Sequence, residues 1–499
     1  MTSSNFEFSA RDYDFTEYVE AKNWIGGEWT PSSSGNSDPV YNPRHGEVMG
    51  SVVMSNASDV QAAFEASKEA QKDWAKWPIR ERAEVLYKLK YLMEQNLDEL
   101  SWLLSHENGK TFPQAKGSVL KGIECVEMGA SLQNMADGGQ LDVSRGVNCR
   151  VVHEPLGVVA GVVPFNFPTM VPLWMIPQAL VGGNGFILKP SEKVPFGSMR
   201  LAELLQEAGL PDGVFNIING GKESVEAIAD HEGIKAAAFV GSTPVAKLLY
   251  ERGSKTGKKM VCLGGAKNHL VVVPDADQEL SSDNIVASFT GCAGQRCMAA
   301  AVLLAVGDTQ HIIDDVIAKA KELEVGVDIG AIVTEESKER IVGYIDQAEA
   351  AGVDIAVDGR GKKVEGHDGW WVGPTILDNV EPGMPCATEE IFGPVLTIIR
   401  VDTLEEALQI ENESPFGNAA AIYTTSGGIA ERAINRFEAG MCGVNIGVPV
   451  PREPFAFGGW NDSKFGHGDM TGWDGFRFWT RPRKVTSKWA LQSDETWMS

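Results

Sequence analysis

A regular alternation of short apolar runs with helical stretches constrains the fold of this chain more than any other feature. The apolar runs have the length of buried strands and lie at 158–163, 186–188, 214–218, 236–240 and 260–263. Stretches of helical length separate them, at about 168–180, 197–208, 223–230 and 244–252. Two parallel strands need a long crossover connection, which is usually a helix. The alternation therefore predicts an α/β fold with a parallel sheet covered on both faces.

The segments on either side add further elements. Short strands are predicted in NWIGGEWTP and VYNPRHGEVMGSVV, and apolar residues at three- and four-residue steps predict one amphipathic helix over 85–100. A second α/β region is expected from about 260 to 445, and RKVTSKW near the end is expected to form a strand.

One predicted helix carries clear boundary signals. Thr243 is a candidate N-cap, Pro244 would be the first helical residue, and Gly253 would follow the last one. A further helical run begins near Gly109 and carries Lys121.

Composition argues against several classes of function. The 499 residues are 43% hydrophobic and 22% charged, as in a globular protein of two or three domains. The net charge of −24 disfavours nucleic acid as a partner, because phosphate binding needs clustered Lys and Arg. No apolar run is long enough for a membrane span, and MTSSNFEFSARDYDF lacks the features of a targeting signal. Seven scattered cysteines suit a reduced compartment, so a cytoplasmic location is expected.

The segment CAGQRCMAA, residues 292–300, is the first candidate for chemistry. Its two cysteines could be a redox pair, two metal ligands, or one nucleophile beside one bystander. The eight His are dispersed, so a metal site is disfavoured. A nucleophile would be a thiolate, which Arg296 beside Cys297 would favour. Two packed thiols next to a surface arginine remain the purely structural interpretation.

Three strand ends carry polar groups, and each has a functional and a structural interpretation. Asn166 in PFNFP is either a turn residue or an amide donor for an oxyanion. Lys189 and Glu192 in FILKPSE are either a charged loop or ligands for ribose hydroxyls, where a carboxylate favours NAD over NADP. FVGSTPVAK is either an ordinary turn or an anion site at a helix N-terminus. The G-x-G-x-x-G fingerprint is absent, so a pyrophosphate site here would be a variant one.

Taken together and in order, PFNFP, LKPSE, FVGS, GQRC and EEIFGPV closely resemble the aldehyde dehydrogenase superfamily. The resemblance runs from NWIGGEW to RKVTSKW, nearly the whole chain. It implies a Rossmann-like NAD-binding domain, an α/β catalytic domain and a small oligomerisation sheet. The expected bounds are 1–132 and 155–258 for the NAD-binding domain, 259–450 for the catalytic domain, 133–154 and 478–499 for the oligomerisation segment, and 451–477 for a substrate-site loop.

The resemblance also implies roles for single residues. Cys297 would attack the aldehyde, and its backbone N–H with the Asn166 side chain would hold the oxyanion. Hydride would then pass to NAD and leave a thioester on Cys297. The implied cofactor-binding residues are Phe165, Lys189, Ser191, Glu192, Gly241, Ser242, Leu263, Glu390 and Phe392.

One difference between this sequence and the hydrolytic members of the superfamily indicates what accepts the acyl group. Those members carry a glutamate that activates water, whereas CLGGAKNH here places Cys262 at that position. The segment GAKNH, together with GQRCMA and PFNFPTMVPLWMIP, is similar to the branch that transfers the acyl group to coenzyme A (CoA). His269 is either part of that chemistry or a packed residue at a strand start.

That branch holds the substrate carboxylate with two arginines. Arg296 matches the one before the nucleophile, and a guanidinium suits a carboxylate well. Lys121 stands in place of the other arginine. It keeps the positive charge but lacks the paired N–H donors with which a guanidinium binds both carboxylate oxygens. The segment 454–468, PFAFGGWNDSKFGHG, departs from the branch as well, so the exact aldehyde stays open.

The leading hypothesis is an NAD-dependent, CoA-acylating oxidation of malonate or methylmalonate semialdehyde, with loss of CO₂ to give acetyl- or propionyl-CoA. A CoA-independent dehydrogenase of another anionic aldehyde, sulfonated or phosphorylated, is the alternative, and a non-catalytic scaffold is a third. The expected partners are the small anionic aldehyde, CoA and further copies of the chain, as a homodimer or homotetramer paired through about 480–490.

Overall fold

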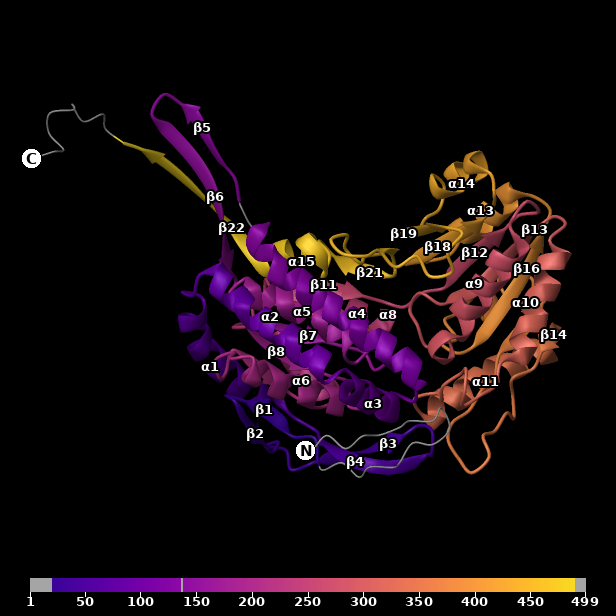
Figure 1. Ribbon diagram of the computed structural model, residues 1–499, viewed down its shortest axis with the longest axis horizontal. Helices are drawn as coiled ribbons and strands as arrows, with labels where there is room; N and C mark the ends of the chain where they lie inside the picture. The colour runs from indigo at the N-terminus through magenta and orange to yellow at the C-terminus, as the bar shows by residue number, and fades with distance from the viewer. Residues whose placement is uncertain (1–19, 136–137, 490–499) are drawn as a thin grey trace, which may run out of the picture.

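The computed structural model describes residues 20–135 and 138–489. Figure 1 shows two α/β bodies and a β arm that projects away from them. The start of the predicted NAD-binding domain, residues 1–19, lies outside the described residues, as do 136–137 and 490–499 of the predicted oligomerisation segment.

The first body is built on an eight-stranded sheet with the order β2-β1-β9-β8-β7-β10-β11-β21. Its parallel centre is β9 (Phe215–Ile217), β8 (Gly185–Lys189), β7 (Val158–Val162), β10 (Ala236–Val240) and β11 (Lys259–Leu263). Antiparallel strands flank this centre, β1 (Asn23–Ile25) and β2 (Glu28–Thr30) on one side and β21 (Lys464–Gly466) on the other. The predicted parallel sheet is therefore confirmed.

Eight helices accompany this sheet among the described residues: α1 (Ala57–Trp74), α2 (Ile79–Gln95), α3 (Leu97–Asn108), α4 (Phe112–Ser131), α5 (Met170–Val181), α6 (Phe196–Glu207), α7 (Lys222–Asp230) and α8 (Thr243–Lys255). The prediction of a single helix over 85–100 is wrong, because the helix is interrupted at Asn96, between α2 and α3. The Asn96 side chain donates a hydrogen bond to the Leu92 carbonyl, which is one of the backbone acceptors at the end of α2.

The predicted boundaries of α8 also need correction. Ser242 is the N-cap and Thr243 is already helical. Gly253 lies inside the helix, and the left-handed glycine after its end is Gly257, with φ of 69°. Only a left-handed residue there lets the chain leave the helix, which explains why a glycine follows.

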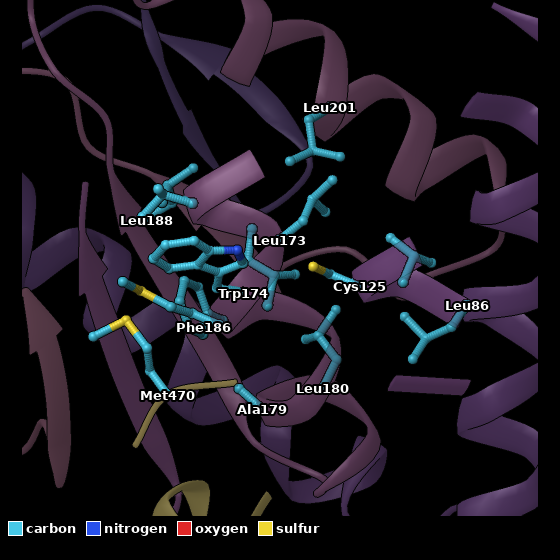
Figure 2. Close-up of a cluster of buried hydrophobic side chains, with 14 of the residues drawn as sticks. Leu86, Cys125, Leu173, Trp174, Ala179, Leu180, Phe186, Leu188, Leu201 and Met470 are labelled. Atoms are coloured by element: carbon cyan, nitrogen blue, oxygen red, sulfur yellow. The ribbon is translucent and has the colours of Figure 1, made fainter. Parts of the chain in front are cut away.

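The core of the first body surrounds α5, which is buried along its length from 171 to 181. Figure 2 shows Leu173 and Trp174 of α5 packed between Phe186 of β8 and Leu86 of α2. Each such side chain stabilises the fold by about 1.5–3 kcal/mol through burial. This packing fixes the loop between β7 and α5, where Asn166 lies.

The second body holds a seven-stranded sheet, β14 (Asp354–Val357), β15 (Thr375–Asp378), β16 (Val395–Val401), β13 (Ala300–Val306), β12 (Asn268–Val272), β18 (Ala419–Tyr423) and β19 (Met441–Val444). All of its pairings are parallel except that of β14. Its helices are α9 (Gln278–Thr290), α10 (Gln310–Glu322), α11 (Glu335–Ala350), α12 (Pro385–Thr388), α13 (Leu404–Asn412) and α14 (Gly427–Ile434). Strand β11 belongs to the first sheet although the catalytic domain was expected to start at 259, and the domain division itself stays a prediction.

The arm is an antiparallel sheet of β5 (Gln140–Ser144), β6 (Val147–Pro155) and β22 (Thr480–Lys488), which follows α15 (Gly472–Trp479). The strand predicted in RKVTSKW is confirmed by β22. The smaller elements are β3 (Ser37–Asn42) with β4 (Glu47–Val53), β17 (Phe416–Gly417) with β20 (Trp460–Asn461), and the 3₁₀ turns η1 (Leu132–Asn134) and η2 (Gly291–Gly294). In the part of the chain that is described, no helix has the length and apolar character needed to cross a bilayer.

Candidate active site

Cys297 lines a pocket in the second body, between η2 and β13. The pocket walls come from 266–268, 294–301 and 390–395. The carbonyl of Cys297 accepts hydrogen bonds from the side-chain amides of Asn268, at 2.8 Å, and Asn418, at 3.1 Å. One amide on β12 and one just before β18 therefore fix the backbone of the predicted nucleophile, whose side chain lines the pocket.

The turn before Cys297 has an unusual backbone. Cys292 and Ala293 adopt left-handed conformations, with φ of 54° and 52°. Helix α9 ends at Thr290, so Cys292 lies in the turn η2 that follows the helix. Its thiol is packed, with 2% exposure, as expected for the bystander.

Asn166 reaches this turn from the first body. Its side-chain Nδ2 donates to the Gln295 carbonyl at 3.0 Å, and the buried Lys110 ammonium donates to the Asn166 carbonyl at 2.5 Å. An amide nitrogen carries two hydrogens, so Asn166 keeps one donor for another acceptor. The structure therefore brings the two predicted oxyanion donors, Asn166 and the Cys297 backbone, to adjacent segments.

The electrostatic setting of Cys297 differs from the expectation. Burial, and then the charge of Glu390, raise the pKa of the Cys297 thiol to about 12. Arg296 does not face this thiol: its Nε donates to the sulfur of Cys292 at 3.3 Å. The expectation that Arg296 favours the Cys297 thiolate is therefore not supported by this arrangement.

Cys292 receives that electrostatic support instead. Burial opposes ionisation of its thiol, but Lys110 and Arg296 together lower the pKa of Cys292 below its ordinary value. The two cysteines of CAGQRCMAA are thus oppositely tuned, which rules out treating them as an equivalent pair.

Glu390 and Phe392 close the pocket from the segment before β16. Glu390 accepts a hydrogen bond from the Ala266 N–H at 3.1 Å, and burial raises its pKa to about 7. Phe392 holds a left-handed backbone, with φ of 55°, and its ring meets Phe165 edge-to-face at 5.8 Å. Both residues, which were expected to bind the cofactor, therefore line the pocket of Cys297, and Phe392 also contacts the loop of Asn166.

The remaining predicted cofactor residues gather at one edge of the first sheet. Phe165 follows β7, Lys189 ends β8, Gly241 follows β10 and Leu263 ends β11, and these strands are neighbours. The carboxyl edge of a parallel sheet is where such folds bind ligands. This placement is what an extended dinucleotide needs.

Local contacts at this edge suit a dinucleotide. Lys189 pairs with Glu192 at 3.0 Å, while the Ser191 hydroxyl accepts from the Lys193 N–H at 3.3 Å. Burial opposes ionisation of Glu192, but Lys189 holds its pKa below the ordinary value, so the carboxylate is charged. A charged carboxylate there can accept from ribose hydroxyls.

The turn into α8 offers the anion-binding groups. The Gly241 N–H donates to the Leu263 carbonyl at 3.1 Å, and no side chain caps α8 at Ser242. N–H groups of the first turn are thus available to a phosphate. A Cβ at Gly241 would lie 2.4 Å from the Phe239 ring, so the turn requires glycine.

Lys121 does not stand free as a second carboxylate ligand. Its ammonium contacts Glu453 at 2.6 Å and Glu124 at 2.9 Å. The Cys125 thiol donates to the other oxygen of Glu453 at 3.3 Å. The charge of Lys121 is therefore matched within the protein, and the pairing ties α4 to the segment that precedes β20.

Cys262 and His269 are both packed side chains. Cys262 of β11 lies opposite Phe239 of β10 and Phe465 of β21 in the sheet, and burial raises the pKa of its thiol to about 12. Burial, and then Lys267, lower the pKa of His269 to about 3, so its ring is neutral. Neither group is set up to activate water, and no carboxylate occupies position 262.

Sequence reasoning missed the residues that hold the site in place. Lys110, Gln295 and Asn418 fix the segments around Asn166 and Cys297, as described above. Lys267 reaches from the pocket to the Cys386 carbonyl at 2.8 Å. Asn268 had a signal, because it belongs to GAKNH, whereas Asn418 lies in no motif that was recognised.

Comparisons with known proteins agree with this arrangement. Residues 29–485 match the sequence model of the Aldehyde dehydrogenase family. Malonate-semialdehyde dehydrogenase 2 of Geobacillus kaustophilus (strain HTA426) is 44% identical over 476 residues, covering 94% of this chain and 98% of that protein. The malonate-semialdehyde dehydrogenase of Halalkalibacterium halodurans is 43% identical, covering 94% of this chain and 98% of its own.

Solved structures are similar over the same length. Methylmalonate-semialdehyde dehydrogenase from Oceanimonas doudoroffii has a TM-score of 0.93 and 39% identity, covering 95% of this chain and 99% of that one. A second similar structure is a Sinorhizobium meliloti 1021 protein assigned as a methylmalonate-semialdehyde dehydrogenase and crystallised with NAD. Its TM-score is 0.94 and its identity is 39%, and the match covers 96% of this chain and 99% of that one. The chain therefore belongs to the aldehyde dehydrogenase family.

Proposed function

We propose that this protein oxidises a small carboxylate-bearing semialdehyde with NAD and transfers the acyl group to CoA. Malonate semialdehyde is the first candidate and methylmalonate semialdehyde the second. The observation that carries the proposal is a pocket lined by both Cys297 and Arg296, with Asn166 bonded to the neighbouring Gln295, while position 262 holds a buried thiol in place of a carboxylate. The names of the similar proteins support the substrate class.

The reaction follows from the roles of the residues. The Cys297 sulfur attacks the aldehyde carbon, and the oxyanion accepts hydrogen bonds from Asn166 and the Cys297 N–H. Lys189, Glu192 and the first turn of α8 would hold NAD, which would supply the hydride acceptor for this carbon and so leave a thioester on Cys297. The thiolate of CoA then attacks the thioester and releases Cys297. Loss of CO₂ from the β-carboxylated acyl group gives acetyl- or propionyl-CoA.

A thiol acceptor matches the absence of a water-activating carboxylate. Water needs a general base to attack a thioester at a useful rate, whereas a thiol supplies a stronger nucleophile. Cys262, with a pKa raised to about 12 by burial, is no such base.

The edge of the first sheet supports NAD as the oxidant. Lys189 and Glu192 lie where they would hold the adenine ribose, and the uncapped start of α8 would hold the pyrophosphate. The charged Glu192 would repel a 2′-phosphate, which favours NAD over NADP.

The two alternative functions have less support than the proposed one. Lys121 and the segment 454–468 motivated a sulfonated or phosphorylated aldehyde as the substrate, and the charge of Lys121 is paired with Glu453 and Glu124. A non-catalytic scaffold would have no need to hold Asn166, Cys297 and an open helix N-terminus in one arrangement. Binding of NAD, measured by calorimetry, separates a scaffold from an enzyme.

We infer a homodimer or homotetramer from the arm. Leu141 of β5 is 67% exposed and Val143 is 51% exposed, which is unusual for apolar strand residues in water. Strand β22 lies at an edge of the same sheet and can pair with another copy. All seven cysteines are free, which suits a reduced compartment and the expected cytoplasmic location.

A panel of aldehydes of similar length tests the substrate class. With NAD and CoA present, kcat/KM for malonate semialdehyde should exceed that for propanal by roughly tenfold or more, because Arg296 can bind only the former's charge. A higher kcat/KM for a sulfonated or phosphorylated aldehyde would contradict the proposal.

A further inference from the structure

We propose that Gly291 and Cys292 form a seat that orients the Arg296 guanidinium toward the substrate's carboxylate. Cys292 is in this view a positioning residue that sets the preference for anionic aldehydes. The inference rests on the proposed function, and it assigns a role to the cysteine that the reaction does not use.

The first observation is how Arg296 is held. Its Nε donates to the Cys292 sulfur at 3.3 Å, and this is the one hydrogen bond of the Arg296 side chain within 20–135 and 138–489. Both terminal nitrogens of the guanidinium are therefore available. Two parallel N–H donors match the two oxygens of a carboxylate, so holding Arg296 by Nε leaves the useful side of the group open.

The second observation is the surface on which the guanidinium rests. A Cβ at position 291 would lie 2.3 Å from Nη1 and 2.4 Å from Cζ of Arg296. The guanidinium therefore packs directly on Gly291, and any side chain there would displace it. Gly291 is needed for its small size, since its φ of −57° is ordinary for any residue.

The third observation is that the turn cannot relax. Cys292 and Ala293 hold left-handed conformations, which cost about 1–3 kcal/mol each in residues other than glycine. The next residue, Gly294, packs closely against the segment that precedes β16. A Cβ at position 294 would lie 2.0 Å from the Gly393 carbonyl oxygen. Strained backbone persists where the surroundings fix it, and strain of this kind concentrates at functional sites.

The charges around Cys292 strengthen the contact. The buried thiol lies near two cations, Lys110 and Arg296, which lower its pKa. A lowered pKa favours the thiolate form of the sulfur, and a thiolate accepts a charge-assisted hydrogen bond that holds the arginine more firmly than a neutral acceptor would. The Lys110 ammonium is itself fixed by the Asn166 carbonyl and the Ser118 hydroxyl.

No other side chain of the pocket can take over from Arg296. Lys267 is the second cation among the pocket-lining residues, and its ammonium donates to the Cys386 carbonyl. Lys121 is paired with Glu453 and Glu124. Selectivity for the anion therefore depends on the orientation of one guanidinium, and hence on its seat.

The test compares malonate semialdehyde with propanal in the full-length enzyme with NAD and CoA. Cys292→Ala should raise KM for malonate semialdehyde about tenfold, leave its kcat within about twofold, and leave both constants for propanal within about twofold. Cys292→Ser keeps a hydrogen-bond acceptor and should recover part of the preference. Gly291→Ala should lose the preference as well, because it displaces the guanidinium. Cys442→Ala, an exposed thiol on β19, is the matched control.

The outcomes separate this inference from the proposed function. If Cys292→Ala lowers kcat/KM equally for both aldehydes, or leaves the wild-type preference intact, the seat is refuted while the function stands. If the wild-type enzyme does not prefer malonate semialdehyde over propanal, the proposed function fails and the seat fails with it. Should Cys292→Ala not fold, as judged by circular dichroism, the ratio measured for Cys292→Ser and Gly291→Ala decides between these outcomes.

Discussion

At the scale of single residues, the nucleophile is held in a resting state. The pKa of Cys297 lies far above neutrality because the thiol is buried and Glu390 lies nearby. An enzyme that stored a free thiolate would be open to oxidation and alkylation. We infer that ionisation of Cys297 depends on moving or neutralising Glu390 when the cofactor and substrate bind.

Removing the charge of Glu390 should make Cys297 more acidic. Above pH 7 the Glu390 carboxylate is ionised and disfavours a second negative charge on the thiol, so Glu390→Gln should lower the Cys297 pKa. The rate of iodoacetamide alkylation of Cys297, followed by peptide mass spectrometry across pH, should shift to lower pH. Glu389→Gln is the control, since that carboxylate accepts from the Tyr344 hydroxyl. An unchanged or upward-shifted profile would refute this account of the resting state.

Lys110 is expected to support catalysis through Asn166. Lys110→Met removes the donor to the Asn166 carbonyl, so the side-chain amide should drift from the oxyanion position. We expect kcat to fall roughly 10- to 100-fold for malonate semialdehyde and propanal alike. Lys116→Met, at an exposed ion pair on α4, the helix that follows Lys110, should have little effect. Wild-type kcat in Lys110→Met would show that Asn166 needs no such support.

At the scale of elements, part of the site could be predicted and part could not. The apolar runs located the parallel strands to within a residue or two, since burial on both faces leaves a clear signal. The break at Asn96 had no glycine or proline to mark it. The left-handed Cys292 and Ala293 were invisible in the same way, because tertiary contacts, not local preference, impose that conformation.

One helix start depends on a carboxylate from another helix. Glu107 of α3 is fully buried and accepts from the Phe196 and Gly197 N–H groups at 2.7 and 3.0 Å, which caps α6. Glu107→Ala removes the carboxyl acceptor of both N–H groups, and the free energy of unfolding should fall by about 3 kcal/mol. Glu107→Gln should cost less, because it keeps one acceptor oxygen.

Urea unfolding monitored by circular dichroism measures these changes. Glu99→Ala is the control on the same helix, and loss of its partly exposed pair with Arg200 should cost less than about 1 kcal/mol. Equal stability of Glu107→Ala and wild type would show that α6 needs no cap from α3.

At the scale of the whole molecule, distant segments meet in ways that no local pattern announces. Lys121 and Glu453 are separated by 332 positions, yet their pairing decides that Lys121 is not a free cation. The resemblance to a family predicted which residues gather at the nucleophile. It could not predict this pair, because Lys121 departs from the family pattern and Glu453 directly precedes the segment 454–468, which departs from it as well.

The arm should mediate assembly. Light scattering should give a mass that is a multiple of the 53.9 kDa chain. Leu141→Glu combined with Val143→Glu places charges on the exposed apolar surface of β5 and should reduce the assembly size. Leu280→Glu, 44% exposed on α9, is the matched control. A wild-type monomer would contradict the proposed assembly.

The central claim is that the acyl group passes from Cys297 to CoA. Its most direct test incubates malonate semialdehyde with NAD, with and without CoA, and measures NADH by absorbance and products by mass spectrometry. Acetaldehyde as substrate controls for loss of CO₂ before oxidation. We predict steady-state NADH formation only with CoA, with acetyl-CoA as the product and slower turnover of acetaldehyde. Equal NADH formation without CoA, with a free acid as the product, would contradict the account.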